Sequence, residues 1–416
     1  MSEKKYPEWP SYSEAEIHSV SAVLSSGKVN YWTGSVTRQF EEEFAKWCGA
    51  KHAVAVSNGT VALDLCLMSL GIGARNGGNT SDEVIVTPRS FVASGSVIVN
   101  AGAIPKFVDV CPDSQNMNPA KIKDTITDNT KAVICVHLAG WPCDIDAIKH
   151  VIGSRDIKII EDCAQAHGAL YKGQPVGSLG DVAAWSFCQD KIMTTGGEGG
   201  MVTCNDDKLW NSIWSYKDHG KSYDRVHSSD QPKGFRWVHD QFGSNYRLTE
   251  MQSAIGRLQL QKMPSWTAAR ARNAQMLIDA FLPFAGADGL IRIPTPKCEG
   301  CNINCPAAGA VAGGCRHAYY RFYVFIRAEN MEAAWSRDRI IDEMLSRSVP
   351  CMHGSCSQIY NEQSFQSAGL QPAYLLPIAQ QLGDSSIAFL VHPTLEEDHM
   401  KSITATAVSV FKRATK

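Results

Sequence analysis

The chain has 416 residues, with 40 Lys and Arg against 42 Asp and Glu, and a formal net charge of −2 at pH 7. This balance provides no basic excess of the kind that nucleic-acid binding requires, and no apolar run approaches the ~20 residues of a membrane span. Residues 1–7 lack the apolar core of a secretory signal, so we expect a cytoplasmic protein without nucleic-acid or membrane partners.

Short apolar segments alternate with helical stretches over the first half of the chain. Strands are expected at residues 53–56, 83–86, 104–110, 132–137, 157–160 and 183–187. Such runs of Val, Ile and Ala are typical of strands buried on both faces. The helical stretches between them, such as 59–70, indicate βαβ units and a mostly parallel sheet. An α/β protein of this kind gathers its functional loops at the carboxyl ends of the strands.

The pattern changes after residue 247. A strongly helical pattern begins at Leu248 and continues to Phe281. Further elements are expected at 319–326 (strand), 338–346 (helix) and 397–412 (helix). We therefore expect a large domain over residues 1–265 and a smaller α+β domain over residues 266–416.

Lys191 lies in a loop between an apolar strand and the glycine-rich stretch 196–200. A lysine in this position can form a Schiff base with a carbonyl compound. The glycines let the backbone approach a bound group because they carry no Cβ. The alternative is a surface lysine in a glycine-rich loop.

Gly59 and Thr60 follow an expected strand and open an expected helix. The free N–H groups and the dipole at such a helix start favour a phosphate or another anion. The alternative is an ordinary helix cap in a tight turn. Ser186, just before the Lys191 loop, offers a second phosphate ligand.

Asp162 and Phe91 follow two further expected strands. A carboxylate at the end of a buried strand needs a partner, and a protonated pyridine nitrogen is one. The alternative for Asp162 is a helix N-cap. Phe91 offers a flat face for ring stacking, or else packs in the core. These strand ends together carry the parts of a pyridoxal 5'-phosphate (PLP) site.

The chain resembles the DegT/DnrJ/StrS family of sugar aminotransferases, which are fold-type-I PLP enzymes. The matching stretches are 57–63, 91–94, 107–110, 136–140, 161–168, 186–200 and 245–252. The resemblance implies an aspartate aminotransferase-like fold. In this fold a large domain with a mostly parallel seven-stranded sheet carries a smaller α+β C-terminal domain.

The resemblance also implies a role for each site residue. Lys191 matches the Schiff-base lysine, Asp162 the partner of the pyridinium nitrogen, and Gln165 the group beside the 3-hydroxyl. The other cofactor contacts match Gly59, Thr60, Phe91 and Ser186. Asn245 matches an asparagine that reaches the cofactor of the neighbouring subunit, which implies a homodimer with shared active sites.

The identity of residue 191 bears on the reaction. Some relatives carry histidine there and act as dehydratases, so Lys191 favours amino transfer, with L-glutamate as the donor and a keto-sugar as the acceptor. The Lys191 amine is expected to move the α-proton with a pKa lowered by its surroundings. Nucleotide-linked hexoses are the commonest acceptors in the family, and the product is expected to be an amino sugar for a surface polysaccharide, lipopolysaccharide or secondary metabolite. An oxidised octulosonate is the alternative acceptor, and a non-catalytic PLP-binding sensor is the alternative of another class.

The segment 296–316 departs from the family pattern. Its cysteines are Cys298, Cys301, Cys305 and Cys315. They have zinc-ligand chemistry, but their spacing fits no common zinc module. A cysteine-rich surface insertion is therefore preferred over a zinc or an iron–sulfur site. His317 and Tyr320, at the start of the next strand, are expected to face the substrate.

Overall fold

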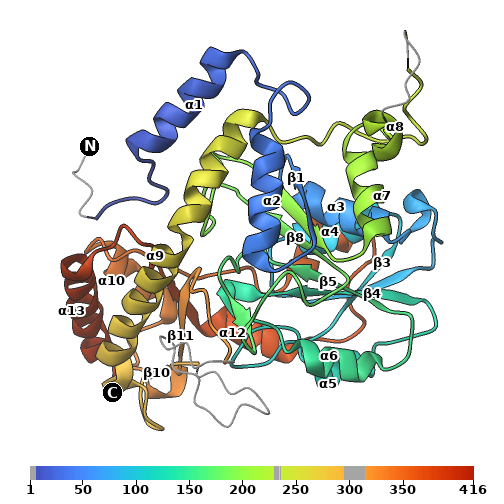
Figure 1. Ribbon diagram of the computed structural model, residues 1–416. Coiled ribbons are helices and arrows are strands. Elements are labelled where there is room, and N and C mark those ends of the chain that lie inside the picture. Colours follow the sequence, from blue (N-terminus) through green and yellow to red (C-terminus); the bar gives the residue numbers. More distant parts are fainter. Residues whose placement is uncertain (1–5, 229–233, 235, 295–313) are drawn as a thin grey trace.

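The computed structural model describes residues 6–228, 234, 236–294 and 314–416 (Figure 1). The chain forms a large unit around a seven-stranded sheet and a smaller unit around a four-stranded sheet. The helix α9 (Glu250–Phe281) runs from one unit to the other.

The large sheet has the strand order β1-β9-β8-β5-β4-β2-β3. Its strands are β1 (His52–Val56), β2 (Glu83–Val86), β3 (Ile104–Phe107), β4 (Thr130–Val136), β5 (Lys158–Asp162), β8 (Val182–Ser186) and β9 (Gly200–Cys204). Neighbours from β3 across to β8 pair in parallel, whereas β9 is antiparallel to both β8 and β1. The structure thus confirms an α/β protein with a mostly parallel seven-stranded sheet.

Helices cover both faces of this sheet because its strands are apolar on both sides. In β1, Val54 and Val56 join the core under one face, and Ala53 and Ala55 join the core under the other. The first face carries α3 (Gly59–Ser69), α4 (Ala93–Asn100) and α7 (Asp207–Lys217), and the second carries α2 (Val36–Cys48) and α6 (Ile145–Ile152). Also in this unit are α1 (Glu14–Ser26), α5 (Pro119–Ile122), α8 (Tyr223–His227) and the hairpin β6 (Leu170–Tyr171) and β7 (Gln174–Pro175).

The smaller unit is built on an antiparallel sheet of order β10-β11-β13-β12. Its strands are β10 (Ile291–Arg292), β11 (Phe322–Ile326), β12 (Cys351–Met352) and β13 (Ser386–Phe389). Its helices are α10 (Arg337–Leu345), α11 (Gln363–Ser367), α12 (Pro377–Ser385) and α13 (Glu397–Ala414). Phe281 at the end of α9 packs against Phe389 and Phe411, so the long helix contributes directly to the core of this unit.

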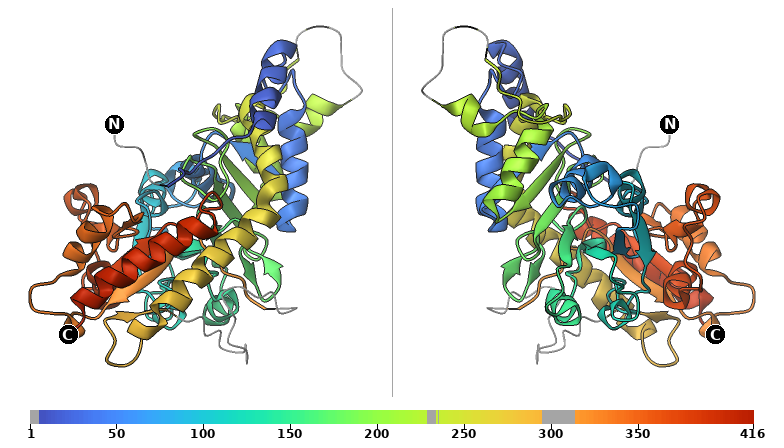
Figure 2. Two further views of the ribbon diagram at one scale, coloured as in Figure 1. Left: turned by 90° about the vertical axis from the view of Figure 1, so that its left-hand side faces the viewer. Right: turned by 90° about the vertical axis from the view of Figure 1, so that its right-hand side faces the viewer.

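The long helix α9 contacts α1 and α2 in the large unit and α13 in the smaller one (Figure 2). It begins at Glu250 because Thr249 caps it: the Thr249 hydroxyl accepts from the N–H of Gln252. The expected start at Leu248 is therefore two residues early. The expected domain boundary between residues 265 and 266 falls inside this helix, next to Pro264.

Two further expectations differ from the structure. The strand expected at 104–110 ends at Phe107, and the strand β9 was not expected at all. Within the described part of the chain, no helix has both the length and the apolar character needed to cross a membrane.

Candidate active site

The expected site residues meet at the carboxyl edge of the large sheet. The neighbouring strands β5 and β8 end at Asp162 and Ser186. Lys191 follows β8 in the loop that leads to β9, and its positive charge acts on the Asp162 carboxyl. Because β5 and β8 are parallel, the three residues lie at the same end of the strands, the carboxyl edge of the sheet.

The start of α3 lies against the end of β8. A Cβ atom on Gly59 would lie 2.6 Å from the Cβ of Ser186, which only a glycine permits. Asn58 caps the helix by accepting from the N–H of Val61 at 2.9 Å, and the first turn contains no acidic residue. The cap therefore does not exclude the anion site: the backbone at Gly59 and Thr60 and the Ser186 hydroxyl form a donor set that fits a phosphate.

Asp162 is a buried carboxylate with neutral donors. Its Oδ2 accepts from the Ser94 hydroxyl at 2.8 Å, and its Oδ1 accepts from the N–H of Ala164 at 3.1 Å. No helix follows β5 directly, so the N-cap alternative is wrong. Burial raises the pKa of Asp162, and these hydrogen bonds and the charge of Lys191 only partly oppose it. A protonated ring nitrogen would supply the close cation that this carboxylate lacks among its hydrogen-bond donors.

Lys191 is only 15% exposed, which excludes the surface-lysine alternative. Its Nζ lies 3.5 Å from Oδ1 of Asp190 and 5.3 Å from the ring centre of Tyr320. Its carbonyl oxygen accepts from the indole N–H of Trp9 at 2.7 Å. Burial lowers the pKa of Lys191, but Tyr320 and Asp190 outweigh it and the net pKa is raised. The expected lowering of this pKa is therefore wrong for the protein without cofactor.

The three other expected cofactor residues differ in their surroundings. Phe91 is 66% exposed, so it does not pack in the core and its ring is free to stack. The Oε1 of Gln165 accepts from the N–H of Ala139 at 2.8 Å, which leaves the amide NH₂ group to donate elsewhere. Asn245 is exposed, and its backbone pairs with Asp218.

The two residues expected to face the substrate differ in position. The hydroxyl of Tyr320 donates to Asp190, so Tyr320 lies beside Lys191. His317 instead stacks on Tyr319 with ring centres 4.1 Å apart and packs edge-on against Trp141. Burial lowers the pKa of His317 to about 3, so its ring is uncharged at neutral pH.

The cysteine cluster is only partly within the described residues. Cys298, Cys301 and Cys305 lie outside them, and the zinc hypothesis stays open. The Sγ of Cys315 accepts from the N–H of Lys172 at 3.3 Å, which attaches this end of the segment to the β6–β7 hairpin.

One buried group of ligand-type side chains lies elsewhere in the described chain: His137, Glu161 and Cys163. The Nε2 of His137 bonds to Glu161 at 3.0 Å, and its Nδ1 accepts from the N–H of Cys143. The carboxylate of Glu161 also accepts from the backbone around Gly177. The group is thus a satisfied hydrogen-bond network that joins β5 to its neighbours.

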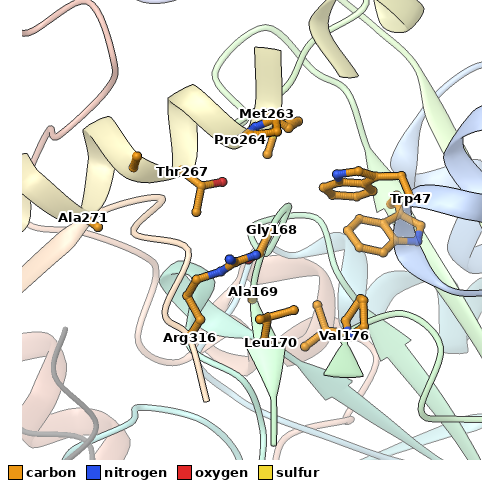
Figure 3. Close-up of a pocket in the computed structure, with 13 residues that line it drawn as sticks. Trp47, Gly168, Ala169, Leu170, Val176, Met263, Pro264, Thr267, Ala271 and Arg316 are labelled. Carbon is orange, nitrogen blue, oxygen red and sulfur yellow. The ribbon is translucent and has the colours of Figure 1, made fainter. Parts of the chain in front are cut away.

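A cavity of about 350 Å³ lies between α9, α2 and the β6–β7 hairpin (Figure 3). Met263 and Thr267 of α9, Trp47 of α2 and Arg316 contribute to its wall. None of the expected cofactor residues lines it, so the candidate active site is the carboxyl edge of the sheet and not this cavity.

The structure adds residues that sequence reasoning missed. Trp9, Asp190, Ser94 and Arg321 all contact an expected site residue. Asp190 and Arg321 could have been found as sequence neighbours of Lys191 and Tyr320. No sequence pattern pointed to Trp9 as a site residue, because 182 residues separate it from Lys191, whose carbonyl it binds.

Comparisons with known proteins find similar aminotransferases. The family model described as DegT/DnrJ/EryC1/StrS aminotransferase matches residues 10–408. The GDP-perosamine synthase of Caulobacter vibrioides is 42% identical over 244 residues, which are 58% of this chain and 61% of that protein, so the match spans less than two thirds of this relative. The dTDP-3-amino-3,6-dideoxy-alpha-D-galactopyranose transaminase of Aneurinibacillus thermoaerophilus is 29% identical over 396 residues, 94% of each chain. The crystal structure of an aminotransferase from Psychrobacter cryohalolentis is 50% identical, with a TM-score of 0.91 over 98% of this chain and 99% of that one.

Proposed function

Because this chain belongs to the DegT/DnrJ/EryC1/StrS aminotransferase family, we propose that it transfers the amino group of L-glutamate to a nucleotide-linked keto-sugar. Membership confirms the resemblance and the fold-type-I architecture, and it makes the chain a PLP-dependent sugar aminotransferase. Relatives named for GDP- and dTDP-linked amino sugars support a nucleotide-linked acceptor. The product is an amino sugar for a surface polysaccharide, lipopolysaccharide or secondary metabolite.

One observation carries the proposal: a buried lysine, a buried acid and an anion-binding helix start converge at one sheet edge. Lys191 and Asp162 are close enough for their charges to interact. Gly59 lies in contact with Ser186 beside them. A lysine, a phosphate cradle and a carboxylate are the three groups that suit the aldehyde, the phosphate and the ring nitrogen of PLP.

When bound, PLP supplies an aldehyde that takes up the amino group and a protonated ring that withdraws electrons. Asp162 would hold a proton on the ring nitrogen, because its carboxylate is buried and has no other cation bonded to it among the described residues. Ser186 and the N–H groups of Gly59 and Thr60 would bind the phosphate. Phe91 would orient the ring by stacking on it.

Lys191 moves the proton at the carbon that carries the amino group. In the protein without cofactor the raised pKa keeps this amine charged at neutral pH, so it must lose a proton before it acts as a base. Asp190 and Tyr320 hold the amine in place. They also offer a carboxylate and a hydroxyl next to the atom from which the proton leaves.

The test uses the chain loaded with PLP and Lys191→Ala as the control. We expect L-glutamate to change the visible absorbance of the cofactor, and a matching keto-sugar to restore it with release of one amino sugar per 2-oxoglutarate. The acceptors to compare are GDP-, dTDP- and UDP-linked 3-keto and 4-keto hexoses and an oxidised octulosonate. An absorbance that does not respond to any amino donor would contradict the proposal and favour the non-catalytic sensor.

We also propose that two chains share their active sites, with Asn245 of each chain reaching the cofactor phosphate of the other. Asn245 is exposed, and the nearby Phe242 is 99% exposed, as expected of side chains that a second copy covers. Mixing Lys191→Ala with Asn245→Ala chains, each inactive alone, should restore about a quarter of the activity, because half of the dimers then carry one intact site. No recovery after exchange of subunits would contradict shared sites. The cytoplasmic location stays a prediction.

A further inference from the structure

Arg321 lies immediately before β11, on the chain segment that brings Tyr320 to Lys191. Its Nη2 donates to the Tyr320 hydroxyl at 3.3 Å, and its guanidinium lies 4.7 Å from the centre of the Tyr320 ring. The Nζ of Lys191 is 5.3 Å from the centre of the same ring. The ring of Tyr320 therefore lies beside both the guanidinium and the amine that the proposed reaction uses.

Asp190 faces both of these cations. Its Oδ1 lies 3.5 Å from the Nζ of Lys191, and its Oδ2 lies 3.8 Å from the Nη2 of Arg321. Tyr320 donates its hydroxyl to the same carboxylate. One carboxylate thus serves two positive charges, and the pair with Arg321 is at the long limit of an ion pair. The cluster has an excess positive charge that a second carboxylate would neutralise.

Most N–H donors of the Arg321 guanidinium have no acceptor among the described residues. Among the described residues, its one hydrogen-bond acceptor is the Tyr320 hydroxyl, whereas a guanidinium carries five N–H groups in a planar fork. The side chain is 16% exposed, so it is neither fully solvated nor sealed in the core. A fork of this kind binds a carboxylate through two parallel hydrogen bonds.

We propose that Arg321 binds the α-carboxylate of the amino donor beside Lys191. This assignment rests on the proposed function, in which the donor is L-glutamate. In an α-amino acid the carboxylate is bonded to the same carbon that loses its proton to Lys191. An anion site close to Nζ therefore suits the donor. The diphosphate of a nucleotide sugar is separated from the keto carbon by the sugar ring, so it does not meet the same requirement.

The test compares L-glutamate with L-isoglutamine, whose α-carboxylate is an uncharged amide. Both are titrated into wild-type and Arg321→Gln enzyme loaded with PLP, and the change in cofactor absorbance gives the half-saturating concentration. For Arg321→Gln we expect about a 10- to 100-fold rise with glutamate, the usual effect of losing a charge-assisted hydrogen bond in a partly buried site. With isoglutamine the change should stay below about threefold. Arg321→Lys, which keeps the charge without the fork, should fall between these values with glutamate.

A binding measurement separates recognition from turnover. α-Methyl-L-glutamate has no α-proton to lose, so its affinity for the loaded enzyme can be measured by calorimetry without transfer of the amino group. Arg321→Gln should weaken the affinity for α-methyl-L-glutamate by a factor similar to the rise in half-saturating glutamate. Tyr320→Phe removes the hydroxyl that joins Asp190 to Arg321 but leaves the guanidinium, so its effect should fall equally on glutamate and isoglutamine.

Three results would overturn the assignment: an unchanged half-saturation with glutamate in Arg321→Gln, an equal loss for glutamate and isoglutamine, or a loss confined to an acidic keto-sugar acceptor. The last result would show that Arg321 binds a carboxylate of the sugar acceptor and not that of the donor. If glutamate does not change the cofactor absorbance of the wild-type enzyme but another α-amino acid does, the proposed donor is wrong. Arg321 is then judged by the same contrast between that acid and its amide.

Discussion

Replacing Gly59 by alanine tests the contact that joins the start of α3 to the end of β8. The new Cβ would lie 2.6 Å from the Cβ and 3.1 Å from the Cα of Ser186, whereas ordinary contacts begin at 3.4 Å. The helix start must therefore shift by several tenths of an ångström. Overpacking of this kind costs about 1–3 kcal/mol. Alanine is favoured over glycine in a helix by about 0.5–1 kcal/mol, which offsets part of the cost.

We therefore expect Gly59→Ala to lower the free energy of unfolding by about 1–2 kcal/mol. We also expect weaker PLP binding, because the N–H groups of Gly59 and Thr60 move away from Ser186. Urea unfolding of the cofactor-free chain measures the first effect, and titration with PLP, followed by protein fluorescence, measures the second. Gly286→Ala is the matched control, since a Cβ there meets nothing within 4 Å.

A second pair of variants separates the clash from the lost hydroxyl. Ser186→Gly removes the Cβ that the introduced alanine side chain would meet, so Gly59→Ala combined with Ser186→Gly should be more stable than the sum of the single changes predicts. Ser186→Ala keeps this Cβ and removes only the hydroxyl, so it should weaken PLP binding and leave the Gly59→Ala clash in place. If Gly59→Ala unfolds at the same urea concentration as Gly286→Ala and binds PLP like the wild type, the reasoning about this contact is wrong.

Three further predictions concern buried charges. Lys191→Ala should abolish formation of 2-oxoglutarate and leave no PLP attached after borohydride reduction, as read by mass spectrometry; attached PLP would assign the covalent bond to another residue. Asp162→Asn should slow the reaction with glutamate by about 100-fold or more. Because burial raises the pKa of Asp162, the folded cofactor-free chain holds this proton more tightly than the unfolded one, and its stability falls as pH rises above the ordinary aspartate range. The asparagine variant should therefore be at least as stable as the wild type at pH 7 in urea, and a clear loss would contradict this sign. The Nζ of Lys217 lies 3.5 Å from Glu41, so Lys217→Met leaves Glu41 as a buried acid without its ion pair. This change should lower the free energy of unfolding by about 3 kcal/mol, and adding Glu41→Gln should restore part of the loss. Additive losses in the double variant would show that the two groups are not coupled.

Most of the large unit could be predicted from the sequence because its strands are continuous apolar runs. Residues 53–56 and 83–86 are strands within one residue of the expected bounds. The strand β9 was missed because it starts with a glycine directly after a glycine-rich loop, where local pattern favours a turn. The strands β10 and β12 have two residues each, too few to show an alternation.

The part of the site that could be predicted consists of residues at or just after the ends of strands. Asp162 and Ser186 end strands that the sequence reveals, Lys191 follows the second of these strands, and the parallel sheet brings the strand ends together. Arg321 could have been considered as the neighbour of Tyr320, but its approach to Asp190 depends on how the smaller unit packs against the Lys191 loop, and no local pattern encodes that packing. His317 was expected to face the substrate because it precedes β11; in the structure its ring stacks on Tyr319, whose backbone is left-handed with φ of 51°.

The helix α9 makes the two units inseparable as expressed fragments. A chain cut after residue 265 would end in mid-helix, one residue beyond Pro264, and would lose the half of α9 that carries Ala274, Leu277 and Phe281. These three side chains belong to the core of the smaller unit, so neither piece would keep a complete apolar interior. We therefore expect the separate pieces to be recovered as aggregates. An exchange of sugar specificity between relatives would have to keep this helix whole and place its junctions on either side of it.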